Sequence, residues 1–208
     1  MARPSMFGED RPDVLRDMIR AHPLATLVTH GESGLAASLV PFTLVTRDDG
    51  PDILRAHMAK GNEQFADLRQ GAEALVIFQG PQAYISPGWY PTKKEHGRAV
   101  PTWNYVVVKA WGRPAVIDDA DWLLTQIDAL TAQQEQGMPE PWSVADAPGP
   151  FIDALVKGIA GIELPIERIE GIWKVSQNQP EVNRRGVASG LRSGGLPSTM
   201  ADIVEAPR

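Results

Sequence analysis

The chain has no cysteine and no long apolar run, and each absence excludes a class of protein. Without cysteine there is no disulfide, no thiolate zinc site and no iron–sulfur cluster. No apolar segment approaches the roughly 20 residues that a membrane-spanning helix needs. The amino-terminal segment MARPSMFGEDRPDVLRDMIRAH lacks the apolar centre of a signal peptide. We therefore expect a cytoplasmic protein without a membrane anchor.

The few histidines give no support to a metal site. They lie at positions 22, 30, 57 and 96, with no pair at the spacing of metal ligands on a helix and no His-Glu-x-x-His element. A Gly-x-Ser-x-Gly nucleophile elbow is also missing, which disfavours a serine hydrolase. We expect no bound metal.

The charge balance argues against broad contact with nucleic acid. The chain carries 26 acidic and 20 basic residues, a net charge of −6 at pH 7. Binding of DNA without sequence preference depends on neutralising phosphates and needs a basic face. With 208 residues, 43% of them hydrophobic, the chain is long enough for one substantial core.

The spacing of apolar residues predicts a mainly β fold with peripheral helices. Val14, Leu15, Met18 and Ile19 form one stripe, which indicates a short amphipathic helix. Residues 24–46 read as a hairpin that bends at Pro41, and further strands are expected at 53–58, 73–80, 83–90, 101–117 and 162–177. The strand at 101–117 would close a barrel. Helical spacing is found at 62–71, 118–136, 151–161 and 178–195.

The stretch AHMAKGNEQF, residues 56–65, fits a phosphate site. A strand that ends near His57, a turn through Lys60 and Gly61, and a helix that starts at Asn62 would direct backbone N–H groups and the positive helix end to one point. Lys60 would add a positive charge there. The alternative is that Asn62 only caps a surface helix while Lys60 lies in water.

Neutral polar side chains interrupt three otherwise apolar strands. Amides and hydroxyls in a β framework suit a planar heteroaromatic ligand, and Trp89 or Trp103 would offer stacking area. Taken one by one, such amides also bridge loops and such tryptophans also fill cores. The three clusters comprise Gln79, Gln82 and Ser86; Trp103 and Asn104; and Lys174, Ser176, Gln177 and Asn178.

Five segments together resemble the PaiB family, the FMN-binding negative transcriptional regulators of bacteria. The resemblance covers the chain from about Met1 to Leu191. The segments are ATLVTHGESGLAASLVPF, ILRAHMAKGNEQF, ALVIFQGPQAYISPGWY, VPTWNYVVVKAWGRP and IWKVSQNQPEVNRRGVASGL.

The resemblance implies an FMN-binding split β-barrel, similar in fold to pyridoxamine phosphate oxidase, that forms a homodimer with FMN at the interface. It implies that the strand at Ala37 to Val40 runs along the isoalloxazine ring, and that the turn near Lys60 surrounds the phosphate. Trp103, Asn104 and the residues after 173 would join the pocket, from the same subunit or its partner. The expected cofactor-binding residues are Ser38, Leu39, Val40, His57, Lys60, Gly61, Asn62, Trp103, Asn104, Lys174, Ser176 and Gln177.

The chain departs from the related oxidases at one point. Leu39 and Val40 stand where a basic residue of an arginine-rich phosphate clamp would be expected, so Lys60 and His57 would have to carry the charge.

Three functions follow as hypotheses. The first is a regulator of the PaiB type, although no helix-turn-helix is found and Arg184, Arg185 and Arg192 are the one basic cluster, so direct DNA binding is disfavoured. The second is an FMN-dependent oxidoreductase with an unknown acceptor, and the third is a haem-handling protein that uses His57 or His30.

We expect a single split-barrel domain over residues 1–192. It would contain a helical insertion at about 118–158 and a carboxy-terminal strand and helix at about 162–192, followed by a tail at 193–208.

Overall fold

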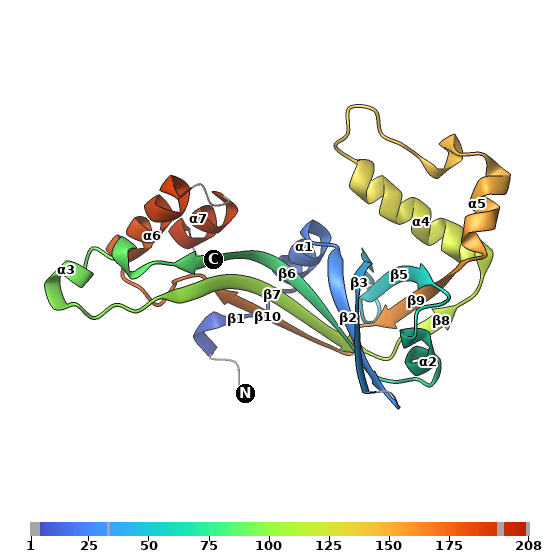
Figure 1. Ribbon diagram of the computed structural model, residues 1–208, viewed down its shortest axis with the longest axis horizontal. Coiled ribbons are helices and arrows are strands. Elements are labelled where there is room, and N and C mark those ends of the chain that lie inside the picture. Colours follow the sequence, from blue (N-terminus) through green and yellow to red (C-terminus); the bar gives the residue numbers. More distant parts are fainter. Residues whose placement is uncertain (1–4, 33, 195–197, 207–208) are drawn as a thin grey trace. The chain divides into compact units, whose positions relative to one another are not determined.

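The computed structural model describes residues 5–32, 34–194 and 198–206, and these form two antiparallel sheets with peripheral helices (Figure 1). The strand order is β1-β10-β7-β6-β2-β3 in one sheet and β4-β5-β9-β8 in the other. The strands are β1 (Gly8–Glu9), β2 (Leu24–Gly31), β3 (Gly34–Pro41), β4 (Thr43–Val45), β5 (Ile53–Ala59), β6 (Ala74–Ile85), β7 (Thr102–Gly112), β8 (Ala115–Ile117), β9 (Ile159–Pro165) and β10 (Arg168–Lys174). The α-helices are α1 (Pro12–Ala21), α2 (Gln64–Arg69), α3 (Lys93–His96), α4 (Ala120–Glu135), α5 (Gly149–Val156), α6 (Glu181–Ser193) and α7 (Ser198–Glu205).

The chain divides into two compact units. Unit 1 comprises Met1–Leu15, Gln79–Val108 and Glu170–Arg208, and unit 2 comprises Arg16–Phe78 and Lys109–Ile169. Strands β6, β7 and β10 contribute residues to both units.

In unit 2, the hairpin of β2 and β3 sets the pattern of burial. The two strands pair over eight residues, from Leu24 opposite Pro41 to Gly31 opposite Gly34. Ala25 and Leu27 on β2 and Val40 on β3 are buried, whereas the residues between them face the other side of the sheet. After Pro41 the chain leaves this sheet, and buried Phe42 packs edge-on against Phe78, with ring centroids 6.1 Å apart, before β4 begins the second sheet.

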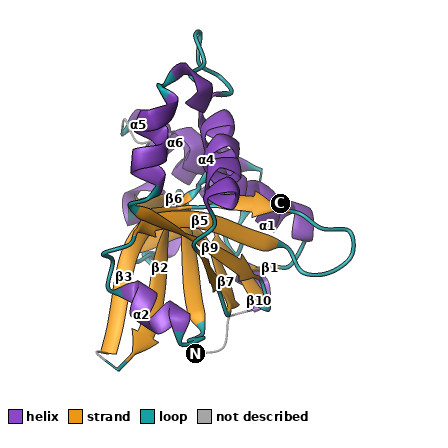
Figure 2. Ribbon diagram, turned by 90° about the vertical axis from the view of Figure 1, so that its right-hand side faces the viewer, coloured by secondary structure: helices purple, strands orange, loops and turns teal. Residues whose placement is uncertain are grey.

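The second sheet of unit 2 is covered by a helix. Strands β5 and β9 pair over seven residues, and α4 packs against β4, β5 and β9 (Figure 2). Leu123 of α4 is buried. Gly161 lies under the ring of Trp122, since a Cβ atom at that glycine would come within 2.3 Å of the ring. Asp119 caps α4 by accepting a 2.7 Å hydrogen bond from the backbone N–H of Trp122.

In unit 1, helices α6 and α7 lie side by side and bury a shared apolar contact (Figure 1). Trp89 packs against Gly186 and Gly190 of α6, where a Cβ atom would meet the main chain or the indole ring at 2.2–2.5 Å. The buried apolar residues of the two helices are Val187, Ala188, Leu191, Met200, Ala201 and Val204. Helix α7 lies in a segment for which the sequence predicted no element.

The elements predicted from long apolar periodicities are confirmed. The stripe of Val14, Leu15, Met18 and Ile19 is buried along α1, and the predicted hairpin and the helices now seen as α4 and α6 are confirmed. The mainly β split-barrel class is confirmed as well.

Three strand boundaries were predicted wrongly. Residues 73–80 and 83–90 were expected as two strands, but β6 runs through Gly80 and Pro81 without a break. Buried positions alternate from Ala74 to Phe78 and then resume one residue out of phase at Ala83, so the glycine and proline are absorbed as an irregularity inside the strand.

The strand expected at 101–117 is two strands in different sheets. Strand β7 ends at Gly112, where a Cβ atom would come within 2.1 Å of the Pro165 carbonyl, and Pro114 cannot donate a hydrogen bond. Residues 159–161, expected as helix, begin β9, and the strand expected at 162–177 is divided into β9 and β10.

Within the described part of the chain, no helix combines the length and the apolar character needed to cross a bilayer.

A buried carboxylate in unit 1 makes stability depend on pH. Glu9 on β1 is 8% exposed, and hydrogen bonds from the side chain and the backbone N–H of Arg11 lower its pKa from 4.5 to about 2. A lowered folded-state pKa contributes stability that is present above pH 4.5 and is lost as the pH falls toward 2.

We therefore expect the free energy of unfolding, measured in urea at pH 6 and pH 3, to fall more steeply for the wild type than for Glu9→Gln, by roughly 1–3 kcal/mol. Glu167→Gln, which removes an exposed ion pair with Arg113, is the matched control and should follow the wild type. Equal pH dependence in Glu9→Gln and the wild type would contradict the assignment.

Candidate functional site

The twelve predicted site residues fall into two groups, one in each unit. Ser38, Leu39, Val40, His57, Lys60, Gly61 and Asn62 belong to unit 2. Trp103, Asn104, Lys174, Ser176 and Gln177 belong to unit 1.

Strand β3 lies at the edge of its sheet. It has β2 as its neighbour on one side, so alternate backbone N–H and C=O groups point away from the sheet. Ser38 is half-buried and Val40 buried on the core side, whereas Leu39 lies 69% exposed on the opposite side. A flat ligand along this edge would therefore meet main-chain groups together with either Ser38 or Leu39.

The turn after β5 is held in place by Asn62. Its side-chain oxygen accepts a 2.9 Å hydrogen bond from the Gln64 N–H, and its amide nitrogen donates to Ser38 Oγ at 3.0 Å. The turn is thus tied to β3, which brings Asn62 and Ser38 together as predicted for one site.

The predicted set of free N–H donors at this turn is partly wrong. The Lys60 N–H donates to the Gly158 carbonyl and the Asn62 N–H to the Ala59 carbonyl, both at 2.9 Å. Helix α2 begins at Gln64 rather than at Asn62, with Glu63 at its N-cap. These two N–H groups are not free to bind a phosphate, because the turn closes on β5 and packs against the segment before β9.

His57 contacts a residue that the sequence did not suggest. Its Nδ1 lies 2.6 Å from Oε1 of Gln126, a buried residue of α4. An amide oxygen only accepts, so Nδ1 of His57 is the donor in this contact. The Nε2 atom of Gln126 is buried and has no hydrogen-bond partner among the described residues. No motif marks Gln126, which is one of several polar residues along α4.

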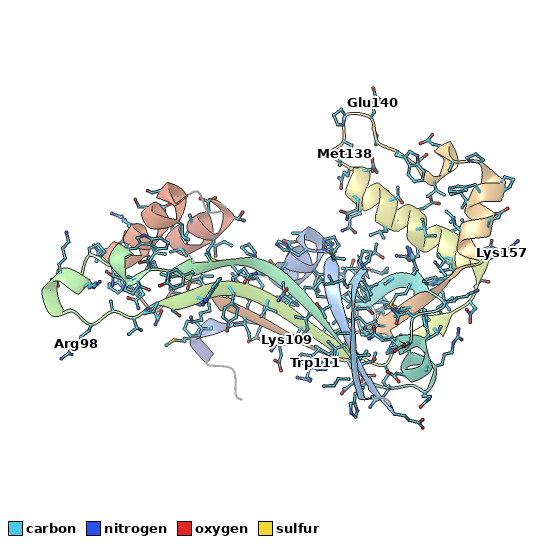
Figure 3. The ribbon with its side chains drawn as sticks, viewed as in Figure 1. Arg98, Lys109, Trp111, Met138, Glu140 and Lys157 are labelled. Atoms are coloured by element: carbon cyan, nitrogen blue, oxygen red, sulfur yellow. The ribbon has the colours of Figure 1, made fainter. Side chains whose placement is uncertain are left out.

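Lys60 lines a pocket of about 340 Å³ under α4 and α5. Lys157, which follows α5 (Figure 3), also lines this pocket. The rest of the lining consists of two aspartates, Asp118 and Asp153, and apolar side chains that include Leu123. Two lysines and two aspartates make the lining formally neutral, and Asp118 also pairs with Arg69 at 2.9 Å.

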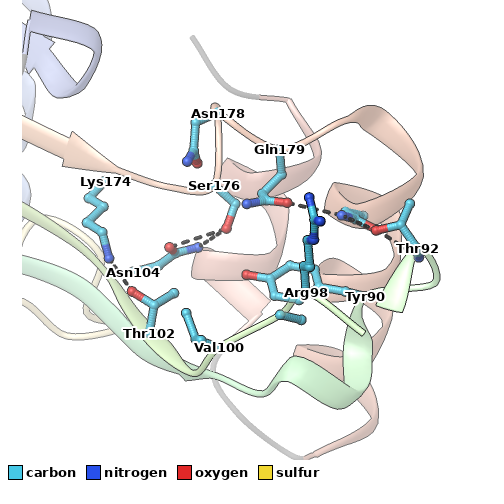
Figure 4. Close-up of a pocket in the computed structure, with 12 residues that line it drawn as sticks. Tyr90, Thr92, Arg98, Val100, Thr102, Asn104, Lys174, Ser176, Asn178 and Gln179 are labelled. Carbon is cyan, nitrogen blue, oxygen red and sulfur yellow. Dashed lines mark hydrogen bonds between the residues drawn. The ribbon is translucent and has the colours of Figure 1, made fainter. Parts of the chain in front are cut away.

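The unit 1 group surrounds a more polar pocket of about 240 Å³ (Figure 4). Asn104 on β7 is 1% exposed and Ser176 is 4% exposed, and the Asn104 amide donates to Ser176 Oγ at 2.9 Å. The Lys174 ammonium donates to Thr102 Oγ1 and to the Trp103 carbonyl. Three of the five predicted residues, Asn104, Lys174 and Ser176, are therefore brought together.

The other two predicted residues of unit 1 lie elsewhere. Gln177 is committed to the main chain, since its amide accepts from the Val175 N–H at 2.8 Å and donates to the Met6 carbonyl at 3.2 Å. Trp103, 54% exposed, lines a separate groove of about 360 Å³ with Gln79, Gln82 and Tyr105.

Burial changes two titratable groups of the unit 1 pocket. Desolvation lowers the pKa of the Lys174 ammonium. Desolvation also raises the pKa of the Tyr90 hydroxyl, and a hydrogen bond with Ser176 partly offsets that rise. The sequence analysis missed Tyr90, Thr92, Arg98, Gln179 and Asn183 of this pocket, because no pattern along the chain shows that these residues meet in space.

Comparison with known proteins identifies the family. Residues 1–168 match the family model described as "Putative FMN-binding domain". The uncharacterized protein AN0679 of Emericella nidulans is 34% identical over 96% of this chain and 94% of its own length. "Protease synthase and sporulation protein PAI 2" of Bacillus subtilis is 28% identical over 97% of this chain and 95% of its own length.

Solved structures support the fold. The conserved hypothetical protein Rv2991 of Mycobacterium tuberculosis superposes with a TM-score of 0.61 at 10% identity, covering 86% of this chain and 94% of that chain. The FAD and heme binding protein of Mycobacterium smegmatis superposes with a TM-score of 0.55 at 16% identity, covering 80% of this chain and 73% of that chain. With a family model that spans most of the sequence, this chain belongs to the PaiB family of FMN-binding-domain proteins.

Proposed function

We propose that this protein is an FMN-binding homodimer, with the flavin held along the exposed edge of β3 and beside the turn at Lys60 to Asn62. The observation that carries the proposal is a second apolar face on the sheet of unit 2. The description of the family supports flavin as the ligand class.

The second apolar face fits another copy of the chain. Leu24 on β2 is 58% exposed, and Leu35 and Leu39 on β3 are 78% and 69% exposed. Thr26 lies opposite Leu39, Val28 opposite Ala37 and His30 opposite Leu35, so these residues form one face that is apolar apart from Thr26 and His30. The other face of the same strands is already buried in the core. Contiguous exposed apolar surface of this kind marks an interaction site.

The residues of the turn suit the ribityl phosphate end of FMN. Lys60 supplies a positive charge, and the amide of Asn62 and the hydroxyl of Ser38 form a rigid polar pair. His57 adds an imidazole whose orientation is fixed by Gln126. When bound, the flavin would supply the redox chemistry, while these side chains would bind and orient it.

A regulatory role of the PaiB type would not depend on direct DNA binding by this protein. The name of the Bacillus subtilis relative refers to protease synthesis and sporulation. On α6, however, Arg185 pairs with Glu181, and Arg192 pairs with Asp202 at 2.8 Å and Glu205 at 2.7 Å. These ion pairs neutralise two of the three arginines of the basic cluster, and Arg184 donates to the Gln179 carbonyl at 3.1 Å. Regulation would therefore act through a partner protein or a bound metabolite.

An FMN-dependent oxidoreductase is the second candidate. The observation that favours it is the preformed polar pocket of unit 1, which offers a place for a second small molecule besides the flavin. Flavin-dependent oxidation of reduced nicotinamide by the purified protein, followed at 340 nm, would separate this function from a purely regulatory one.

The phosphate assignment predicts a difference between two flavins. Lys60→Met should weaken FMN about tenfold or more and leave riboflavin nearly unchanged, because only FMN carries the phosphate that the ammonium would bind. The affinities are measured by quenching of flavin fluorescence. Lys94→Met, which removes an exposed lysine of α3, is the control and should bind both flavins like the wild type. Equal losses for FMN and riboflavin in Lys60→Met would place the phosphate elsewhere.

The dimer assignment predicts a change of mass. Leu39→Asp should convert a particle of twice the 22.6 kDa chain into a single chain in analytical ultracentrifugation, because a carboxylate would be buried in the apolar face. Leu155→Asp is the control: it changes an exposed leucine on α5, outside the face of β2 and β3, and this variant should remain dimeric. A wild-type protein that sediments as a single chain, or a dimeric Leu39→Asp variant, would contradict the assignment.

A further inference from the structure

The polar pocket of unit 1 has a charge that differs from that of the whole chain. The protein carries a net charge of −6, yet of the described residues that line this pocket two are basic and none is acidic. The basic residues are Lys174 on β10 and Arg98 in the loop after α3 (Figure 4). A local positive potential in an acidic protein attracts anions.

Lys174 is placed to bind an anion. Its ammonium donates to two neutral oxygens, those of the Thr102 hydroxyl and the Trp103 carbonyl, and it lies 5.9 Å from the ring centre of Tyr105. None of these partners carries a negative charge. Burial lowers the pKa of this ammonium, and an anion in the pocket would restore its preference for the charged form.

The remaining lining is a rigid set of hydrogen-bonding groups. Asn183 of α6 accepts from the Thr92 hydroxyl at 3.1 Å and donates to Gln179 at 3.0 Å, and Asn104 is bonded to Ser176. Ser176 has a φ of 63°, in the left-handed region that few residues other than glycine adopt. Such backbone strain persists where the surroundings over-determine a conformation, and it concentrates at ligand sites.

The size of the pocket limits the ligand. Its volume is about 240 Å³, which is below the roughly 300–1,000 Å³ of pockets that enclose a drug-sized molecule. A whole flavin nucleotide does not fit, whereas an inorganic anion, a small carboxylic acid or the phosphate end of a larger molecule does.

We propose that the pocket of unit 1 is a binding site for a small oxyanion, phosphate or carboxylate, held by Lys174 and Arg98 with Asn104, Ser176 and Thr102 as polar partners. The oxyanion is either a free small molecule or the phosphate end of a flavin nucleotide. Binding of inorganic phosphate alone tests this site independently of the proposed flavin site at β3 and Lys60.

The test is isothermal titration calorimetry of the full chain with inorganic phosphate and with acetate at low ionic strength. The wild type should show saturable binding of at least one of them, and Lys174→Met should weaken it by about ten- to a hundredfold, because the charge-assisted hydrogen bond is lost. Lys94→Met removes a lysine that does not line this pocket and should bind like the wild type. Absence of saturable binding by the wild type, or full binding by Lys174→Met, would overturn the proposal.

Two additions keep the outcome clear. Thermal unfolding shows whether Lys174→Met is folded. If that variant does not fold, Arg98→Gln, a change at an exposed position, replaces it and should also lower the affinity for the anion. Displacement of phosphate by FMN but not by riboflavin would assign the site to the flavin phosphate. Phosphate binding that FMN leaves unchanged would assign it to a free small anion, and phosphate binding in a protein that takes up no flavin would support this site while contradicting the proposed function.

Discussion

The pairing of β2 with β3 in a single register is the constraint on which unit 2 depends. Because side chains alternate across a strand, this register sends Ala25, Leu27 and Val40 into the core and Leu24, Leu35 and Leu39 to the opposite face. Both faces of the sheet are therefore apolar, but one chain covers only one of them. A shift by one residue would exchange the two faces. Strand β3 is the last strand of its sheet, and the proposed flavin site uses that edge.

Unit 1 depends instead on a polar framework. Asn104 and Asn183 are buried, and each is satisfied by hydrogen bonds to neighbouring side chains that line the same pocket. Buried amides are costly unless they are paired, so the network fixes the shape of the pocket even without a ligand. The contrast with the pocket of Lys60 is one of charge. Two aspartates balance the lysines there, whereas no acidic residue lines the pocket of Lys174 among the described residues.

The sequence was informative where one rule governs many residues. The stripe on α1 and the alternation of β2 and β3 follow from helix and strand periods. The cofactor-binding residues taken from the resemblance to the PaiB family stay a prediction. The sequence was uninformative where the outcome depends on tertiary contacts. The continuity of β6 through Pro81 and the end of β7 at Gly112 depend on neighbouring strands. The contact of His57 with Gln126 joins positions 69 residues apart, and no local pattern encodes it.

The central claim is that two chains pair through the apolar face of β2 and β3 and that each pair binds flavin along the edge of β3. Native mass spectrometry of the protein after incubation with excess FMN tests it most directly, because one spectrum counts both chains and flavins. The account predicts a dominant species of two chains with two bound FMN molecules. A single chain with one FMN, or a dimer that takes up no flavin, would contradict it.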